Sequence, residues 1–376
     1  MSLTMTPDAP AAARPQEDPL KIGMIAPPWF ELPPKGYGGT EAVVAALVDQ
    51  LVARGHEVTL IASGAPGTKA QHYVRVHDEP PSELLGSSVM PELVLAAEAG
   101  RALRELDLDV VHDNSAAGPL LAAGRHEPTV VTMHGPVSGD NGDYYRRLGT
   151  SIELVAISRA QMRQAPGLNW AGCVPNGIDV KSFPFRAHKE DWVLWIGRFC
   201  ADKAPHLAIE AARRAGRPIV LAGKLSEPPE KEYFDQYVRP MLGPDVHYVG
   251  VADAALKREL YSKAACLVFP IQWEEPFGMV MAEALACGTP VVATPRGSVP
   301  EIVRDGTTGF IARGIDAFAQ AINRVEEIDP AACRRDAEQR FDLPVMAAGY
   351  ERVYRMLVAG RRTIATLPVT TTSAAA

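Results

Sequence analysis

The strongest constraint on the fold of this chain is a regular alternation of short apolar segments with helical segments, and the alternation occurs twice. The first series begins with a buried strand predicted at 21–26 and a helix at 40–54, and further strands follow as far as 173–175. The second series begins with a strand at 192–196 and a helix at 205–215. Strands that alternate with helices form parallel sheets with helices on both faces. The sequence therefore predicts an α/β protein with two Rossmann-like domains.

The chain length also favours two domains. At 376 residues the chain exceeds the roughly 250–300 residues at which a single hydrophobic core stops growing. Residues 20–185 are predicted to form the N-terminal domain and residues 186–344 the C-terminal domain, with an interdomain cleft between them. Residues 1–19 and 361–376 are expected to be disordered, and an amphipathic helix at 345–358 precedes the second of these segments.

Charge and cysteine usage argue against several classes of protein. The formal net charge is −7 and no basic run offsets it, so no nucleic acid is expected as a partner. No apolar run reaches the roughly 18–20 residues of a membrane span, and the first residues lack the apolar core of a signal peptide. The five cysteines are widely spaced and lie mostly in apolar runs, which indicates reduced core thiols. We expect a soluble cytoplasmic protein and leave open a weak contact with a membrane surface; the oligomeric state is not predicted.

Three common catalytic signatures are absent from the sequence. Glu41 stands where the last glycine of a Gly-x-Gly-x-x-Gly motif would be needed, and there is neither a P-loop motif nor a Gly-x-Ser-x-Gly elbow. Hydride transfer and P-loop chemistry are therefore not expected. Asp107 and Asp109 superficially offer a metal-binding pair, but they lie at the start of a predicted strand, whereas ligands bind at the carboxyl ends of parallel strands. We predict no metal site.

A glycine-rich loop, residues 36–41, follows the first predicted strand and opens the first helix. It would bring bare backbone amides and the positive end of a helix dipole to the carboxyl edge of the sheet, where an anion or a sugar could approach. The simpler interpretation is that Thr40 caps the helix and Glu41 favours its first turn. His134 lies at the carboxyl end of another strand, where ligand-facing residues gather, although a lone histidine is often structural. The segment 139–147 beyond it is interpreted as a loop that either holds a polar acceptor or is simply solvated.

Two cations meet at a helix start in the second half of the chain. Arg198 follows a strand, and Lys203 stands just before the helix at 205–215. Such a pair suits a diphosphate group, because the helix N-terminus adds its own positive end. Surface cations near an acid are also common, so this pair indicates a ligand site only in combination with the segment described next.

That segment, residues 273–299, places Glu275 and Glu283 on either side of Gly278, which opens an almost wholly apolar helix. A carboxylate among apolar neighbours is costly to bury unless hydroxyl or amide groups satisfy it. A ligand rich in hydroxyl groups would do so. The alternatives are that Glu275 is a carboxylate favoured at a helix start and that Glu283 occupies an exposed position.

Together these segments resemble the retaining glycosyltransferases of family 4, which have the GT-B fold and use nucleotide-sugar donors. The resemblance runs from Lys21 to Tyr354, and its most specific element is the pair of glutamates, Glu275 and Glu283, separated by seven residues. In one departure, the segment ending in Trp273 replaces the Pro-Ser of many family members, which sets this tryptophan near the expected donor. The supporting matches are Gly38-Gly39-Thr40-Glu41, Thr132-Met133-His134-Gly135, Ala156-Ile157-Ser158, Pro175-Asn176-Gly177-Ile178-Asp179 and Gly197-Arg198 with Lys203.

The resemblance implies a role for each matching residue. Arg198 and Lys203 would bind the donor diphosphate and stabilise charge on the departing nucleotide. Glu283 would hold the ribose hydroxyls, Glu275 the transferred sugar, and His134 would lie beside that sugar. These residues, without Glu283, form the expected catalytic set. The remaining expected donor contacts are Gly38, Gly39, Phe277, Gly278 and Met279.

The resemblance also implies an enzyme that moves a hexose from a nucleoside diphosphate sugar to a hydroxyl acceptor with retention of anomeric configuration. UDP-glucose is the first donor we expect. No cofactor and no essential metal are expected, because cationic side chains can do the work of a metal at the diphosphate. The alternatives are a nucleotide-sugar epimerase on the same fold and a non-catalytic nucleotide-sugar binding protein. The helix at 345–358 is expected to cross back to the first domain.

Overall fold

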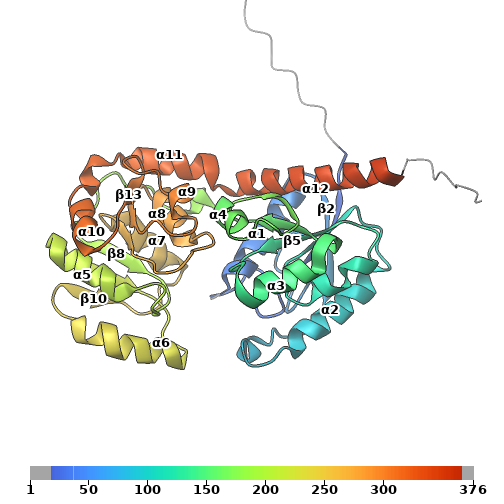
Figure 1. Ribbon diagram of the computed structural model, residues 1–376, viewed down its shortest axis with the longest axis horizontal. Helices are drawn as coiled ribbons and strands as arrows, with labels where there is room; N and C mark the ends of the chain where they lie inside the picture. The colour runs from blue at the N-terminus through green and yellow to red at the C-terminus, as the bar shows by residue number, and fades with distance from the viewer. Residues whose placement is uncertain (1–17, 37, 366–376) are drawn as a thin grey trace, which may run out of the picture.

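The computed structural model describes residues 18–36 and 38–365. Two lobes lie side by side, and the long helix α12 (Leu343–Ala365) runs along one of them (Figure 1). Each lobe is built on one parallel sheet, so the predicted α/β class with two Rossmann-like domains is confirmed. Of the segments predicted to be disordered, residues 1–17 and 366–376 lie outside the described residues, and residues 361–365 are helical as the end of α12.

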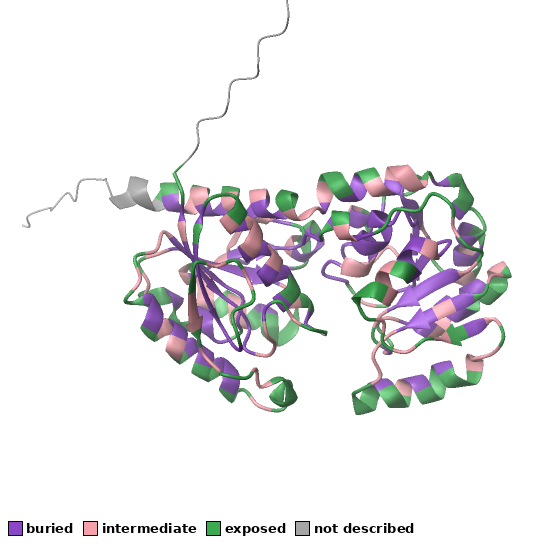
Figure 2. Cartoon of the chain, turned by 180° about the vertical axis from the view of Figure 1, so that it is seen from behind, coloured by how far each residue is buried: buried purple, intermediate pink, exposed green. Residues whose placement is uncertain are grey.

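The N-terminal lobe contains a seven-stranded sheet in the order β3-β2-β1-β4-β5-β6-β7, with every neighbouring pair parallel. Its central strands are buried, as parallel strands are when helices cover both faces (Figure 2). The strands are β1 (Lys21–Ile25), β2 (Glu57–Ala62), β3 (His72–Arg75), β4 (Val110–Asp113), β5 (Thr129–Met133), β6 (Glu153–Ala156) and β7 (Trp170–Cys173). The helices and 3-10 turns are α1 (Gly39–Ala53), η1 (Ser82–Leu84), α2 (Met90–Leu103), η2 (Gly118–Gly124), α3 (Gly139–Leu148), η3 (Gly149–Ser151) and α4 (Arg159–Gln164).

The C-terminal lobe contains a six-stranded parallel sheet in the order β10-β9-β8-β11-β12-β13. Its strands are β8 (Val193–Ile196), β9 (Ile219–Ala222), β10 (Val246–Tyr248), β11 (Leu267–Phe269), β12 (Val291–Ala293) and β13 (Gly309–Ile311). The helical elements, starting with the turn that links the lobes, are η4 (Val180–Ser182), α5 (Pro205–Ala215), α6 (Pro228–Tyr233), η5 (Phe234–Val238), η6 (Arg239–Met241), α7 (Ala254–Lys263), α8 (Met279–Ala286), α9 (Val299–Ile302), α10 (Ile315–Ile322), η7 (Val325–Glu327) and α11 (Pro330–Arg340).

Three elements of the N-terminal lobe differ from the prediction. Strand β3 carries no apolar alternation, because it lies at the edge of the sheet with its side chains exposed or half-exposed. The segment 139–147, interpreted as a loop from its Gly, Asp and Asn content, forms helix α3. The predicted strand at 173–175 also lies a few residues earlier, as β7.

Helix α12 follows the C-terminal lobe in sequence but packs on α1 of the N-terminal lobe. The Tyr354 hydroxyl lies 2.7 Å from Nδ1 of the buried His112 in β4, which ties the helix to the centre of the sheet. Neither α12 nor any other described helix combines the length and apolar composition that crossing a membrane requires. The α12 side chains that join the core of this lobe are Met346, Ala347, Tyr350, Val353, Tyr354 and Val358.

Candidate active site

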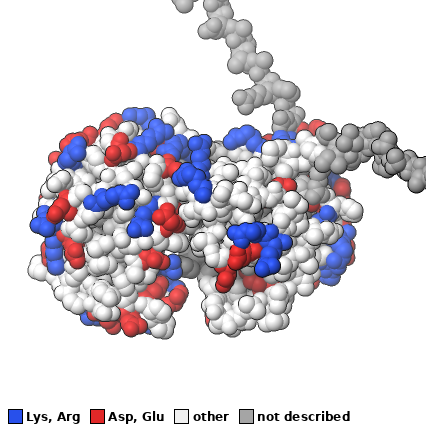
Figure 3. Space-filling model, in the orientation of Figure 1, with Lys and Arg blue, Asp and Glu red and all other residues white. Residues whose placement is uncertain are grey.

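A cavity of about 650 Å³ lies between the two lobes and is called the interdomain cavity below. The space-filling view shows the indentation that separates the lobes (Figure 3). The N-terminal lobe lines the cavity with residues 34–36, which follow β1. The C-terminal lobe contributes Arg198 after β8, Lys224 after β9, and Glu283 of α8. Residues from both lobes therefore meet at the carboxyl ends of their strands, as expected for a ligand site in parallel sheets.

Glu283 lines this cavity although only 6% of the residue is exposed. Two side chains of α7 satisfy its carboxylate: Lys257 Nζ donates to Oε1 at 2.6 Å, and the Tyr261 hydroxyl donates to Oε2 at 2.9 Å. Burial raises the pKa of Tyr261 well above its ordinary value, so the phenol remains a donor. A carboxylate held in this way keeps lone pairs for the hydroxyl groups of a ligand. The alternative that Glu283 occupies an exposed helix position is therefore wrong.

Lys203 and Glu275 form an ion pair whose side chains are only 15% and 8% exposed. Lys203 Nζ and the Trp273 indole both donate to Oε2 of Glu275, the indole at 2.9 Å. The ammonium also lies 5.0 Å from the centroid of the Trp273 ring, within cation–π range. Within the described residues, Oε1 of Glu275 has no partner. The pair therefore retains one acceptor oxygen for a ligand.

The backbone beside Lys203 adopts a conformation that residues other than glycine rarely take. Ala204, the next residue, is buried and has a left-handed φ of 46°. Strain of this kind persists only where the surroundings determine the conformation, and it is common at functional sites. The Trp195 indole donates to the carbonyl of Lys203 at 3.1 Å, which fixes the turn. Lys203 is therefore presented from a rigid turn.

The segment that carries Glu275 is held in place by Gly297 and Ser298. A Cβ atom on Gly297 would lie 2.2 Å from the carbonyl oxygen of Glu275, so only glycine fits there. The φ of 55° at Gly297 also favours glycine, because other residues rarely adopt a left-handed backbone. The Ser298 amide donates to that carbonyl at 2.9 Å. Within the described residues, no acceptor is found for the backbone amides of Phe277, Gly278 and Met279.

Arg198 is exposed at the end of β8. Among the described residues, its guanidinium group has neither a hydrogen-bond nor an ion-pair partner. The Cβ of Lys203 lies 3.9 Å from the position of a Cβ on Gly197, the residue before Arg198. An unpaired guanidinium group in a cavity is well suited to a phosphate, which it binds through two parallel hydrogen bonds.

A second cavity, of about 320 Å³, lies in the N-terminal lobe and is called the N-lobe cavity below. His134 lines it at the end of β5, with Nε2 3.0 Å from Oδ1 of Asn114. Asn114 donates through Nδ2 to the Ile25 carbonyl at 3.1 Å, so its oxygen accepts and Nε2 of His134 donates. Burial lowers the pKa of His134 to about 4. The ring is therefore neutral at pH 7, and Nδ1 is an acceptor.

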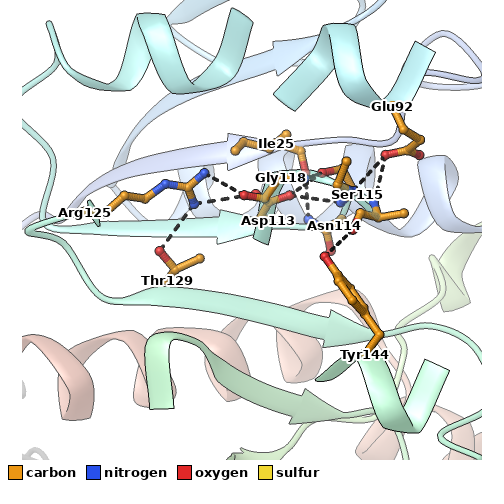
Figure 4. A network of polar contacts seen from close by, with 11 residues as sticks. Ile25, Glu92, Asp113, Asn114, Ser115, Gly118, Arg125, Thr129 and Tyr144 are labelled. Carbon is orange, nitrogen blue, oxygen red and sulfur yellow. Dashed lines mark hydrogen bonds and ion pairs between the residues drawn. The ribbon is translucent and has the colours of Figure 1, made fainter. Parts of the chain in front are cut away.

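A buried polar network fixes the wall of the N-lobe cavity (Figure 4). Glu92 of α2 accepts hydrogen bonds from the backbone amides of residues 116–117 and, at 3.0 Å, from the indole of Trp29. Asp113, at the end of β4, faces Arg125 with 3.6 Å between Oδ2 and NH1. Burial raises the pKa of Asp113, while Arg125 lowers it. The network joins β4, α2 and the loop after β1, so the cavity wall is preformed.

The loop before α1 connects the two cavities, because residues 34–36 line the interdomain cavity and residues 38–41 line the N-lobe cavity. Ligands bound in both would therefore meet at this loop. The N-cap of α1 is Gly38, and no side chain caps the helix, so the interpretation of Thr40 as a cap is wrong. The side chain of Phe277 packs on Phe341 in the core instead of lining either cavity. The predicted residues fall into three groups: Gly38, Gly39 and His134 at the N-lobe cavity, Arg198 and Glu283 at the interdomain cavity, and Lys203 with Glu275 in the ion pair.

Asp107 and Asp109 both contact Lys21 at the start of β1. Asp107 pairs with Lys21 Nζ at 2.7 Å, and Asp109 accepts from the Lys21 amide at 2.9 Å. Among residues 18–36 and 38–365, no group of three or more His, Cys, Asp or Glu side chains is arranged to hold a metal ion.

Several site residues carry no signal in the sequence. Lys257 and Tyr261 reach Glu283 from 26 and 22 residues away, and no local motif marks them. Gly297 and Ser298 lie near the end of segment 273–299, and no local motif marks their contact with Glu275. Glu92 of α2 is far in sequence from the residues it contacts, so its role depends on tertiary contacts alone.

Two family models match consecutive parts of the chain. The model described as Glycosyltransferase Family 4 matches residues 37–182, and the model described as Glycosyl transferases group 1 matches residues 179–340. Two parallel-sheet lobes with a ligand cavity between them, together with these matches, define a glycosyltransferase of the GT-B fold. The chain belongs to glycosyltransferase family 4.

Characterised glycosyltransferases resemble the chain over nearly its whole length. It is 26% identical to a phosphatidyl-myo-inositol mannosyltransferase of Mycolicibacterium smegmatis, over 89% of this chain and 93% of the relative. It is 28% identical to a glycogen synthase of Mycobacterium tuberculosis, over 91% and 96% of the two chains. The crystal structure of AviGT4, a glycosyltransferase involved in avilamycin A biosynthesis, is similar with a TM-score of 0.69 at 29% identity, over 91% and 99% of the two chains. The protein is therefore an enzyme, a glycosyltransferase.

Proposed function

We propose that the enzyme transfers a hexose from a nucleoside diphosphate sugar to a hydroxyl acceptor, with retention of anomeric configuration and with UDP-glucose as the first donor to test. The observation that carries this proposal is the interdomain cavity, where the unpaired Arg198 and the lysine-bound Glu283 line one space. A cation suits the diphosphate, and a held carboxylate suits the ribose hydroxyls. The names of the relatives support a hexose, since one of them is a mannosyltransferase.

In the proposed reaction, the acceptor oxygen forms a bond to the anomeric carbon on the face from which the nucleoside diphosphate departs. The bond between that carbon and the phosphate oxygen breaks, and the acceptor proton passes to the departing phosphate oxygen. Arg198 and Lys203 stabilise the negative charge that develops there. Glu275 and the free amides at the start of α8 bind the sugar hydroxyls, and neutral His134 accepts a hydrogen bond through Nδ1.

We also propose that no divalent ion is needed, because Arg198 and Lys203 supply the positive charge beside the diphosphate. Enzyme treated with a chelator and then dialysed should keep its rate of transfer. A loss of rate that added Mg²⁺ or Mn²⁺ restores would contradict this part of the proposal.

Calorimetry against UDP, GDP and ADP sugars tests the donor site. Glu283→Ala should weaken binding of the preferred donor at least tenfold, which is about 1.4 kcal/mol. Tyr261→Phe is the matched control, because it removes one hydrogen bond to Glu283 and keeps the carboxylate. Unchanged affinity in Glu283→Ala would exclude the ribose role.

Product analysis with the preferred donor separates transfer from its alternatives. A new glycoside with the donor's anomeric configuration, together with stoichiometric nucleoside diphosphate, is the expected result. An altered nucleotide sugar without release of nucleoside diphosphate would indicate an epimerase, and binding without turnover a non-catalytic protein.

A further inference from the structure

The N-lobe cavity is lined by acids and lacks cations. Glu41 and Glu92 both line it, and none of its described lining residues is lysine or arginine. Burial lowers the pKa of its histidine, His134, to about 4, so this residue adds no positive charge at pH 7. Lys35, in the neighbouring loop, is already paired with Glu31 at 3.0 Å. The electrostatic environment inside the cavity is therefore negative.

Of the two carboxylates that line this cavity, Glu41 has fewer hydrogen-bond partners. The residue lies in the first turn of α1 and is only 4% exposed. In the part of the chain that the structure describes, its own backbone amide is the only hydrogen-bond donor to its side chain. A buried carboxylate without partners costs free energy, and an acid that served only the helix dipole would do so equally well when exposed. The position of Glu41 therefore indicates a ligand.

Glu92 shows what a structural carboxylate in the same cavity looks like. It is also buried, but it accepts hydrogen bonds from two backbone amides and from the indole of Trp29. These three hydrogen bonds use most of the acceptor capacity of Glu92 and hold the cavity wall. Burial raises the pKa of both Glu41 and Glu92; the charge of Glu92 raises the pKa of Glu41 further, and the charge of Asp113 does the same for Glu92. A third negative group between them would meet repulsion that no cation offsets.

We propose that the N-lobe cavity binds an uncharged, hydroxyl-rich part of the acceptor, an inference that rests on the proposed function. Glu41 accepts hydrogen bonds from its hydroxyl groups, and the cavity rejects acceptors that carry a phosphate there. Trp29, Phe30 and Tyr145 supply aromatic faces that pack on a sugar or cyclitol ring. The loop shared by the two cavities places this acceptor beside the donor.

Matched acceptor pairs test this assignment in the full-length enzyme with its preferred donor. The probes are glucose with glucose 6-phosphate and myo-inositol with myo-inositol 3-phosphate, and the readout is kcat/KM for new glycoside. The uncharged member of at least one pair should be used at least tenfold more efficiently than its phosphate. Equal or preferential use of the phosphates, or no use of any uncharged probe by enzyme that binds the donor, would overturn the inference.

Variants of Glu41 assign the effect to this residue. Glu41→Gln should raise the KM of the uncharged acceptor about tenfold, leave the donor affinity unchanged and reduce discrimination against the phosphate. Glu41→Asp keeps the charge and should retain most of the discrimination, while Glu105→Gln, at an exposed site of the same lobe, should behave as wild type. An unchanged acceptor KM in folded Glu41→Gln would overturn the assignment. If the wild-type enzyme bound no nucleotide-sugar donor, the proposed function itself would be contradicted.

Discussion

At the scale of single residues, three buried carboxylates at the site differ in what satisfies them. Glu283 has a lysine and a phenol, Glu275 has a lysine and an indole, and Glu41 has only its own amide among the described residues. A fully satisfied carboxylate contributes to stability, whereas an unsatisfied one reduces it until a ligand binds. The three positions should therefore respond differently to substitution.

On the proposed function, Lys203→Ala should lower kcat about 100-fold, because Lys203 is proposed to stabilise the charge that develops on the leaving diphosphate. The substitution also leaves Glu275 buried without its cation, so some loss of stability is expected. Single-turnover rates normalised to donor-binding sites separate the two effects. Lys263→Ala, which removes the surface pair with Glu259, is the control and should leave both quantities unchanged. A Lys203→Ala variant with wild-type turnover would remove this residue from the catalytic set.

Glu41→Gln should stabilise the protein at neutral pH. Because burial raises the pKa of Glu41, the folded state holds this proton more tightly than the unfolded state does. Its contribution to stability is therefore present at acidic pH and is lost as pH rises through the folded-state pKa. At pH 7.5 the variant should melt about 2 to 4 °C above the wild type, the shift that about 1 kcal/mol produces in a domain of this size. The difference should vanish near pH 4 in thermal unfolding; a variant that is less stable at pH 7.5 would contradict the argument.

At the scale of elements, α12 contributes core side chains to a lobe that it does not follow in sequence. Tyr354→Ala should destabilise the N-terminal lobe by about 3 to 5 kcal/mol, the usual cost of removing a buried aromatic ring. Tyr354→Phe should cost about 1 to 3 kcal/mol, since it leaves Nδ1 of buried His112 without its partner. Hydrogen exchange in α1 measures both effects. Met356→Ala, at an exposed position of the same helix, is the control and should leave protection unchanged. If Met356→Ala lost as much protection as Tyr354→Ala, the role of the buried face of α12 would be contradicted.

Helices and strands can be predicted from the sequence where a local pattern of apolar and turn residues determines them. The apolar strands β5 and β8 and the helix that opens at Gly278 follow from periodicity and turn residues. Edge strand β3 and polar helix α3 could not be predicted in this way, because tertiary contacts decide them. The same limit applies to the site. Glu283 stands in a recognisable motif, but its partners on α7 are brought to it only by the folded sheet.

At the scale of the whole molecule, two lobes share one ligand region at the loop before α1. The lobes also touch through Glu301 of α9, which accepts from the Arg159 amide at 2.8 Å and from Arg163 at 3.1 Å. None of these three residues lines the interdomain cavity; they line a separate cavity instead. A donor in the interdomain cavity should bring the two linings together, as ligands do in enzymes that close around their substrates.

Nucleoside diphosphate binding should consequently protect both lobes from hydrogen exchange. With UDP at about 100 times its Kd, linkage stabilises the bound form by about 2.7 kcal/mol. Slower exchange is expected at residues 35–36 of the N-terminal lobe and at 197–198, 253–254 and 257–258 of the C-terminal lobe, since all of them line the cavity. Arg198→Ala should abolish protection in both lobes together, because Arg198 is proposed to hold the diphosphate between them. Protection confined to the C-terminal segments would show that the loop before α1 is not part of the donor site, and the two cavities would then act separately.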